Sequence, residues 1–246
     1  MTTFAKKSID KIMVKINLET NPLFKEEMAN LGFKKIKGEF VSRNNDATNL
    51  IVWGYATKGE KHVRYYFCSC MVEYPAVLEI AEKLDVMVHP IGTNIGYVMP
   101  KNRFTEWEIR ESYSEKKLIS VMNDIIKSIE KYAMPYFERI STIDGFIKTI
   151  EQGKGRGVNY DDKLPPILYR LLGNEEKAQK YIEQTLKKLS AYEEPQSLFE
   201  VKETKDYCQV TFQSAGNRNL EIYEDFAQKF NISKDVFTHR IGGLVF

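Results

Sequence analysis

The sequence has few cysteines and few histidines, and it has no long apolar run. Three residues of each type occur among 246, and they are Cys68, Cys70, Cys208, His62, His89 and His239. A small, odd number of cysteines does not build a disulfide framework, so we expect a reducing compartment. No stretch approaches the roughly 18 apolar residues of a spanning helix, and the first residues lack the apolar core of a secretory signal. We therefore expect a cytoplasmic protein without a membrane partner.

An excess of charge of one sign is also missing. Lys and Arg number 36 and Asp and Glu number 34, which gives a net charge of +2. The balance holds in both parts of the chain, with 16 basic and 14 acidic residues in 1–113 and 20 of each in 114–246. A dedicated nucleic-acid binder needs clustered basic residues to neutralise phosphates. The charge distribution therefore argues against a nucleic-acid partner.

Motifs that would indicate an enzyme are missing as well. Cys68-x-Cys70 places two thiols on one face of a strand, but a structural zinc site needs four ligands, and the second pair is absent. The basic, glycine-rich run 153–157 has neither the spacing nor the preceding strand of a phosphate-binding loop. We expect no catalytic residue, no metal ion and no cofactor, and we interpret the two thiols as buried and inert.

What the sequence does contain is a strand-rich segment between helices. Apolar spacing and turn residues predict strands at 33–43, 49–57, 62–72, 95–99 and 104–109. Helical periodicity covers most of 5–31, with a break at Asn21-Pro22, and returns at 114–133, which Met134-Pro135 should end. We predict an α+β fold in which an antiparallel sheet of four or five strands packs on helices.

The segment 62–72 is the strongest strand prediction, and it is apolar on both faces. Val63, Tyr65, Phe67, Ser69 and Met71 point one way, and Arg64, Tyr66, Cys68, Cys70 and Val72 point the other. This pattern predicts a central strand that helices cover on one side and that is only partly wet on the other.

The remainder of the chain is predicted to be mainly helical. Three glycines lie within the polar segment 153–162, which is the best candidate for a linker. A helical hairpin follows, and near the end a strand at 207–213 and helices at 220–230 and 232–240 are expected. The sequence therefore predicts a sheet domain at 1–152 and a helical C-terminal part at 163–246.

One group of residues is a candidate binding surface. Aromatic and arginine side chains recur through the strand-rich segment, a composition typical of interaction hot spots and of surfaces that stack a base or hold an anion. Ordinary packing of a sheet explains the same composition, and the register that decides between the two is unknown. The residues are Arg43, Trp53, Tyr55, Arg64, Tyr66, Tyr97, Arg103 and Trp107.

A resemblance to a known family rests on short apolar motifs. Gly32-Phe33 enters the strand-rich segment, Trp107 follows it, and the long helix ends in a phrase containing Pro135 and Phe137. Residues 8–152 thereby resemble the bacterial family known as domain of unknown function 4304, although Tyr136 replaces a tryptophan-like position. The resemblance implies an α+β fold and a bacterial cytoplasmic protein, and it implies no reaction.

Three hypotheses for function follow. The first is a non-catalytic protein-interaction module, of the immunity or accessory type, that binds a protein partner. The second is a domain that binds a small ligand or nucleotide through the aromatic and arginine face, which a deep pocket would favour. The third is an enzyme of unrecognised type, which a buried cluster of titratable groups would favour.

Overall fold

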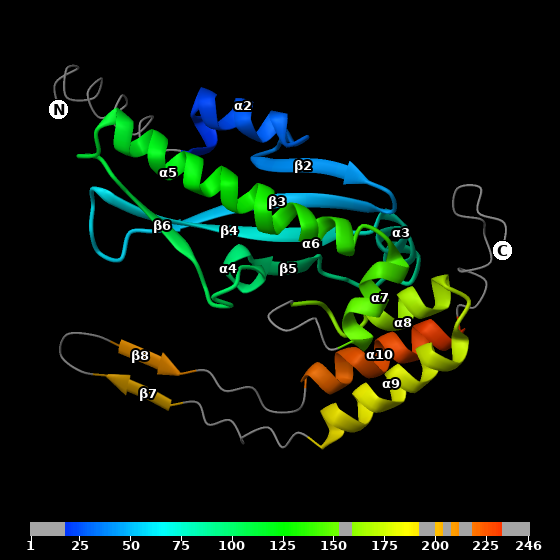
Figure 1. The fold of residues 1–246 in the computed structure, drawn as a ribbon. Coiled ribbons are helices and arrows are strands. Elements are labelled where there is room, and N and C mark those ends of the chain that lie inside the picture. The colour runs from blue at the N-terminus through cyan, green and yellow to red at the C-terminus, as the bar shows by residue number, and fades with distance from the viewer. Residues whose placement is uncertain (1–17, 153–158, 192–199, 204–207, 212–217, 233–246) are drawn as a thin grey trace. The chain divides into compact units, whose positions relative to one another are not determined.

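The protein, described by a computed structural model, is an α+β protein that divides into two compact units (Figure 1). The structure describes residues 18–152, 159–191, 200–203, 208–211 and 218–232. The first unit comprises 1–78 and 89–161, and the second comprises 79–88 and 162–246. The expected linker at 153–162 includes the observed boundary at Asp161–Asp162, and its residues 153–158 lie outside the described part. The sequence did not indicate that 79–88 belong with the second unit.

The first unit is built on a six-stranded antiparallel sheet. β1 to β4 form a meander in chain order, and β4 then pairs with both β5 and β6. Two-residue loops join the first strands, and Lys37, Gly38 and Asn45 take positive φ there, as hairpin turns require. The single strand expected at 33–43 is therefore a hairpin. The strands are β1 (Lys34–Ile36), β2 (Glu39–Asn44), β3 (Ala47–Ala56), β4 (Val63–Glu73), β5 (Ile91–Asn94) and β6 (Glu106–Arg110).

β5 and β6 share one edge of β4, so the six strands occupy five positions. β5 pairs with Ser69–Val72 of β4, whereas β6 pairs with Val63–Phe67. Between them the chain forms the short helix α4 (Ile95–Val98), so the strand expected at 95–99 is wrong. The Asn94 side chain explains the change, because its Oδ1 accepts hydrogen bonds from the backbone N–H groups of Gly96 and Thr105, both at 2.9 Å. An asparagine that caps a helix in this way stops the strand.

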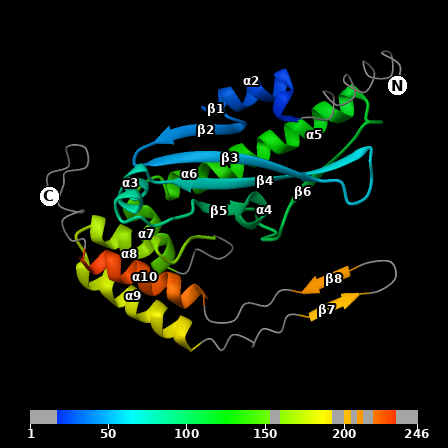
Figure 2. The ribbon, with the colours of Figure 1, turned by 180° about the vertical axis from the view of Figure 1, so that it is seen from behind.

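The pairing gives the sheet two distinct faces. On β4 the residues from Arg64 to Val72 with even numbers are all buried, and those from Tyr65 to Glu73 with odd numbers are all half-buried. The helices α2 (Pro22–Asn30), α5 (Glu115–Ser128) and α6 (Met134–Arg139) lie on the even face, which we call the inner face. Figure 2 shows the opposite face, which we call the outer face, with α5 and α6 behind the strands. The prediction of a central strand covered on one side is confirmed.

The helices begin and end largely at the residues that the sequence marks. Asn21 caps α2 by accepting hydrogen bonds from the N–H groups of Leu23 and Phe24, and Gly32 with a φ of +84° follows its end. Ser114 caps α5. Thr142 caps α7 (Ile143–Glu151). The expected end of the long helix at Met134-Pro135 is wrong, because the helix continues past Pro135.

A π-helical turn carries the long helix past its proline. This turn, η2 (Ile129–Ala133), lies between α5 and α6. A proline has no N–H, and its ring clashes with the carbonyl four residues before it in a regular α-helix. The wider π turn is the kind of local irregularity that accompanies such an interruption. The helix therefore presents Tyr136 and Phe137 to the core of the first unit, where both side chains are buried.

The second unit contains a helical hairpin and a third helix, and the side chain of one arginine connects the two. The described helices are α8 (Leu164–Leu171), α9 (Glu175–Ser190) and α10 (Arg218–Ile232), and the strands β7 (Glu200–Glu203) and β8 (Cys208–Thr211) pair antiparallel. Buried Arg170 of α8 binds the Glu175 carboxylate at the start of α9 through Nε and Nη2. Its Nη1 donates to the Phe230 carbonyl of α10 at 2.6 Å, and its guanidinium lies 3.4 Å from the centre of the Phe230 ring. A cation thus satisfies a carbonyl near the end of a helix.

We expect Arg170→Met to destabilise the second unit by about 2–4 kcal/mol, because the Phe230 carbonyl loses its arginine donor and the Glu175 carboxylate loses its own while keeping its hydrogen bond from Gln179. Chemical denaturation and hydrogen exchange of α8 to α10 measure the loss. Lys180→Met, an exposed change on α9, is the matched control. Equal stability of the two variants would contradict the role given to Arg170.

Candidate functional site

The structure brings five of the eight predicted binding residues together on the inner face. Tyr55 stands opposite Tyr66 in the register, Tyr66 stands opposite Trp107, and Arg64 lies one step further along the same face of β4. Trp53 completes the group, because its ring lies 6.5 Å from that of Trp107. The group is largely core, since all of its members except Tyr55 are buried.

Arg64 is the charged member of this group. Its guanidinium stacks on the Tyr55 ring at 4.4 Å and donates a hydrogen bond to the Tyr66 hydroxyl at 3.2 Å. The stack covers the apolar stem of the arginine, a packing role that long cationic side chains often take. These contacts hold the β3–β4 pair together from the inner side.

The two tryptophans differ in how their polar atoms are satisfied. Trp107 donates from Nε1 to the Asp124 carboxylate of α5 at 2.7 Å, which ties the helix to β6. Trp53 packs edge-on against Phe24 of α2 at 5.5 Å, and its buried Nε1 has no hydrogen-bond partner. An unpaired buried donor is uncommon and costs stability.

The other three predicted residues lie apart from this group. Arg43 is exposed on the outer face of β2, Tyr97 is exposed in α4, and Arg103 is exposed in the loop before β6. The eight residues therefore do not form one surface. That any of them binds a partner stays a prediction.

The outer face carries a group of apolar side chains. None of them was among the candidates predicted from the sequence, because those candidates were chosen among aromatic and arginine residues. Its centre is on β3 and β4, where Leu50 is buried and the neighbouring apolar side chains are half-buried. At the two edges, Ile36 of β1 and Phe104 before β6 are each 50% exposed. The signal was in the sequence, because the odd-numbered residues of 62–72 are largely apolar. This outer-face patch consists of Ile36, Val41, Leu50, Val52, Phe67, Met71 and Phe104.

Two glycines make this patch flat. A Cβ on Gly54 would lie 2.2 Å from Cζ of Phe67, so the ring of Phe67 lies across β3 at that point. The centre of the same ring lies 5.7 Å from that of Phe104. Met71 lies over Gly92 of β5 in the same way, at an ordinary contact distance of 3.6 Å. Large side chains thus lie along the sheet instead of standing out from it.

Charged residues form the rim of the outer face. In the register, Lys34, Glu39 and Arg43 lie on β1 and β2, Glu73 lies at the end of β4, and Glu106, Glu108 and Arg110 lie on β6. Between Leu50 and Ala56 of β3, and between Tyr65 and Met71 of β4, the outer face has no charged residue. An apolar centre with a polar rim is the anatomy of a protein–protein interface.

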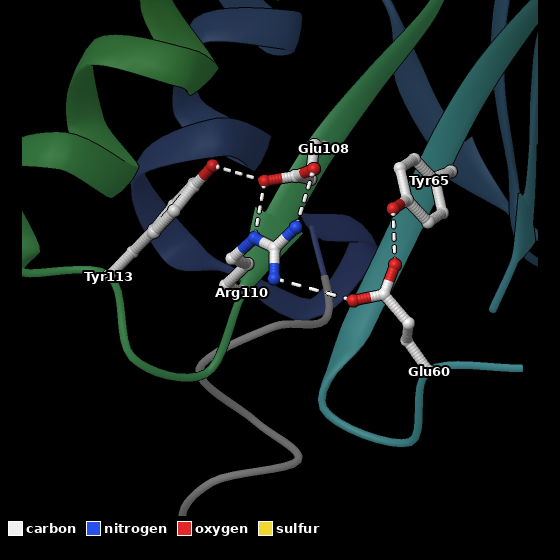
Figure 3. A network of polar contacts seen from close by, with 5 residues as sticks. All are labelled: Glu60, Tyr65, Glu108, Arg110 and Tyr113. Carbon is white, nitrogen blue, oxygen red and sulfur yellow. Dashed lines mark hydrogen bonds and ion pairs between the residues drawn. The ribbon is translucent and has the colours of Figure 1, made fainter. Parts of the chain in front are cut away.

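Figure 3 shows a hydrogen-bonded network at the β6 end of this rim. Arg110 donates to both oxygens of Glu108, at 2.5 and 3.0 Å, and a third bond reaches Glu60 at 3.4 Å. The hydroxyl of Tyr113 donates to Glu108 at 2.9 Å, and that of Tyr65 donates to Glu60 at 2.6 Å. Next to this network, Lys58 pairs with Glu106 and His62 pairs with Glu111. The network therefore neutralises much of the acidic charge on this side.

The titration of these groups follows from the contacts. Hydrogen bonds from Arg110 and then Tyr113 lower the pKa of Glu108, and the bond to Glu108 raises the pKa of Arg110. The bond to Glu60 raises the pKa of Tyr65, whereas the pKa of Tyr113 is raised mainly by burial and then by its bond to Glu108. Each of these four shifts moves the pKa further from neutral pH, so the four groups keep their ordinary charges there.

The two cysteines of β4 are buried free thiols, as expected. Burial raises the pKa of Cys68 well above its ordinary value, so the thiolate is disfavoured. Among the described residues, no three histidine, cysteine or acidic side chains gather where a metal ion could bind. No helix in the described part of the chain is long and apolar enough to cross a membrane.

No family model matches the chain, and comparison finds no similar protein among curated proteins or solved structures. The resemblance of residues 8–152 to domain of unknown function 4304 therefore stays a prediction.

We expect Gly54→Ala to destabilise the first unit by roughly 1 kcal/mol or more, because the new methyl group displaces the Phe67 ring from Phe104. Gly92→Ala is the matched control and should be neutral or stabilising, since alanine costs less conformational entropy than glycine in a strand. Urea denaturation of both variants measures the difference. In a Phe67→Ala background the cost of Gly54→Ala should disappear, and its persistence there would refute the proposed clash.

We expect Glu108→Gln to lower stability at pH 7 by less than about 1 kcal/mol, the range for exposed ion pairs. The pKa of Glu108 lies below its ordinary value of 4.5 in the folded chain. Its contribution is therefore present above that value and is lost as the pH falls through the lowered pKa. Urea midpoints between neutral and acidic pH should converge for wild type and variant. Glu82→Gln on the exposed side of α3 (Pro75–Lys83) should show no such trend, and a pH-independent difference for Glu108→Gln would contradict an electrostatic role.

Proposed function

We propose that this protein is a non-catalytic protein-interaction module that binds a partner through the outer face of its sheet. The single observation that carries the proposal is the outer-face patch with its charged rim. An antiparallel sheet that faces water on one side normally alternates apolar and polar residues. Here the central strands instead present Val52, Phe67 and Met71, half-buried, on the face opposite α2, α5 and α6.

The flatness of the patch supports a protein partner over a small ligand. Small molecules bind in concave sites that enclose most of their surface. Phe67 and Met71 lie over Gly54 and Gly92, where a missing side chain would otherwise leave a recess. A level apolar surface with a charged rim suits the side chains of another protein.

The alternative function, binding of a small ligand by the inner-face group, has less support than the proposal for the outer face. Its rings pack against α2 and against each other, and Trp107 is held by Asp124. One observation favours a ligand there, namely the buried Nε1 of Trp53 without a partner, which an oxygen atom of a bound molecule would satisfy. A ligand would shift the fluorescence of Trp53, and Trp53→Phe would abolish that shift.

The proposal places the protein in the cytoplasm. Cys68 and Cys70 are free thiols with no exposed surface, and such thiols persist in a reducing compartment. A bacterial origin and an immunity or accessory role belong to the same proposal, and the resemblance described above bears only on the bacterial origin.

Pull-down of tagged protein from its native lysate, with mass spectrometry of what co-purifies, tests the proposal. We expect one stoichiometric partner, and we expect Val52→Lys or Ile36→Lys to reduce its capture at least about tenfold, because a charge then enters the apolar contact. Leu23→Lys is the matched control, since Leu23 of α2 is 52% exposed and Ile36 is 50% exposed. Circular dichroism of each variant confirms folding.

A partner captured equally by wild type and by both outer-face variants would overturn the choice of surface. A bound small molecule without any protein would move the function to the second hypothesis.

A further inference from the structure

Two charged residues of opposite sign stand on either side of β3 at one level of the outer face. Arg43 of β2 and Glu73 of β4 are both register partners of Thr48. Neighbouring strands lie about 4.8 Å apart, so the two residues are separated by roughly 10 Å. Neither side chain has an ion-pair or hydrogen-bond partner among the described residues.

The next level along β3 is apolar on both sides. Val41 of β2 and Met71 of β4 are both register partners of Leu50, and all three point to the outer face. At these two levels of β3, an apolar residue on one side is therefore matched by an apolar residue on the other, and a positive residue is matched by a negative one. A surface with this pattern is complementary to itself.

A two-fold rotation about an axis parallel to β3 converts this pattern into contacts. The rotation turns a second sheet face to face with the first and places β2 of each copy over β4 of the other. Arg43 of one copy then lies over Glu73 of the other, and the reverse contact forms by symmetry. Val41 lies over Met71, while Leu50 and Val52 lie near their own counterparts.

We propose that the outer face binds a second copy of this chain, with the two-fold axis parallel to β3. The inference rests on the proposed function, because it names the occupant of the same surface. Each copy contributes both members of the Arg43–Glu73 pair, so one dimer contains two such pairs around an apolar centre.

The dimensions of the sheet suit this arrangement. Packed sheets lie about 10 Å apart, a gap that an arginine and a glutamate can span from opposite sides. Five strand positions and central strands of 10 and 11 residues give a face of roughly 20 by 35 Å. The plane of this face measures about 700 Å², close to the roughly 800 Å² of accessible surface that each partner contributes to a stable interface, and the relief of the side chains adds to it.

The environment of Glu73 is consistent with an ion pair to a cation of a second molecule. Its side chain is half-buried, and burial together with Glu39 raises the pKa of its carboxyl group. A carboxylate in this position gains stability when an arginine approaches it. The acidic residues at the β6 end already have Lys58 and Arg110 as partners, so they do not compete for Arg43.

Analytical ultracentrifugation of the full chain, over about a hundredfold range of concentration, tests the proposal. We expect a reversible species of twice the chain mass. Glu73→Arg and Arg43→Glu should each raise the dissociation constant at least about tenfold, because like charges then face each other at two places. The double variant with both changes should return to within about threefold of wild type, since each copy again brings one charge of each sign.

Glu82→Arg is the control for an added charge, because Glu82 is exposed on α3 and is not one of the residues of the outer face. Recovery in the double variant also excludes misfolding as the cause of the single losses. A chain that stays monomeric over the whole range overturns the proposal, and so does a dimer that both single variants leave intact or that the double variant does not restore.

The two proposals fail in different ways. If the chain is monomeric but Val52→Lys still abolishes capture of a different protein, the outer face binds another partner and only the second copy is refuted. If capture is insensitive to Val52→Lys and the chain is monomeric, the outer face is refuted as a docking surface altogether.

Discussion

The antiparallel pairing of β3 with β4 is the constraint on which the first unit depends. Nine residue pairs from Thr48–Glu73 to Ala56–Tyr65 hold the two strands in one register. Because side chains alternate with a period of two, this register decides at once which residues face the helices and which face away. A slip by one residue would bury Glu73 and expose Cys68 and Cys70. The apolar residues of α2 and α5 therefore find their partners only in the observed pairing.

The aromatic residues on the two faces of this strand pair differ in how deeply they are buried. On the inner face, Trp53 and Trp107 are covered by helices, and Arg64 lies along Tyr55 with its charge directed at a hydroxyl group. On the outer face, Phe67 is held flat by the absence of a side chain at Gly54. Aromatic composition by itself is therefore a poor guide to a binding surface, because burial is decided by strand parity and not by residue type.

Much of the fold was predictable because local chemistry marks it. The caps at Asn21 and Ser114, the stop at Gly32 and the two-sided pattern of 62–72 all depend on residues close in sequence. The differences arise at interactions that the spacing of apolar residues does not reveal. Asn94 ends β5 through a bond to Thr105, eleven residues away, and a π turn allows the long helix to pass Pro135.

The candidate site was less predictable than the fold. The alternation of side chains between the two faces of β4 could be read from the sequence. That Val41, Ile36 and Phe104 lie on the same face could not, because it depends on how the other strands pair. The placement of Arg43 and Glu73 at one level of β3 likewise follows from two pairings that no local motif specifies.

The division of the chain into units has a consequence for dissecting it. The second unit takes residues 79–88 from the middle of the first, so the backbone passes between the units three times. Within the second unit, Lys229 of α10 binds the side chain and the carbonyl of Asp85 in that stretch. A truncation after Asp161 would remove α8 to α10 yet leave 79–88 behind with the buried side chains of Ile80, Ala81 and Leu84. Neither unit is encoded by a continuous part of the gene, so the two must be produced and handled as one polypeptide.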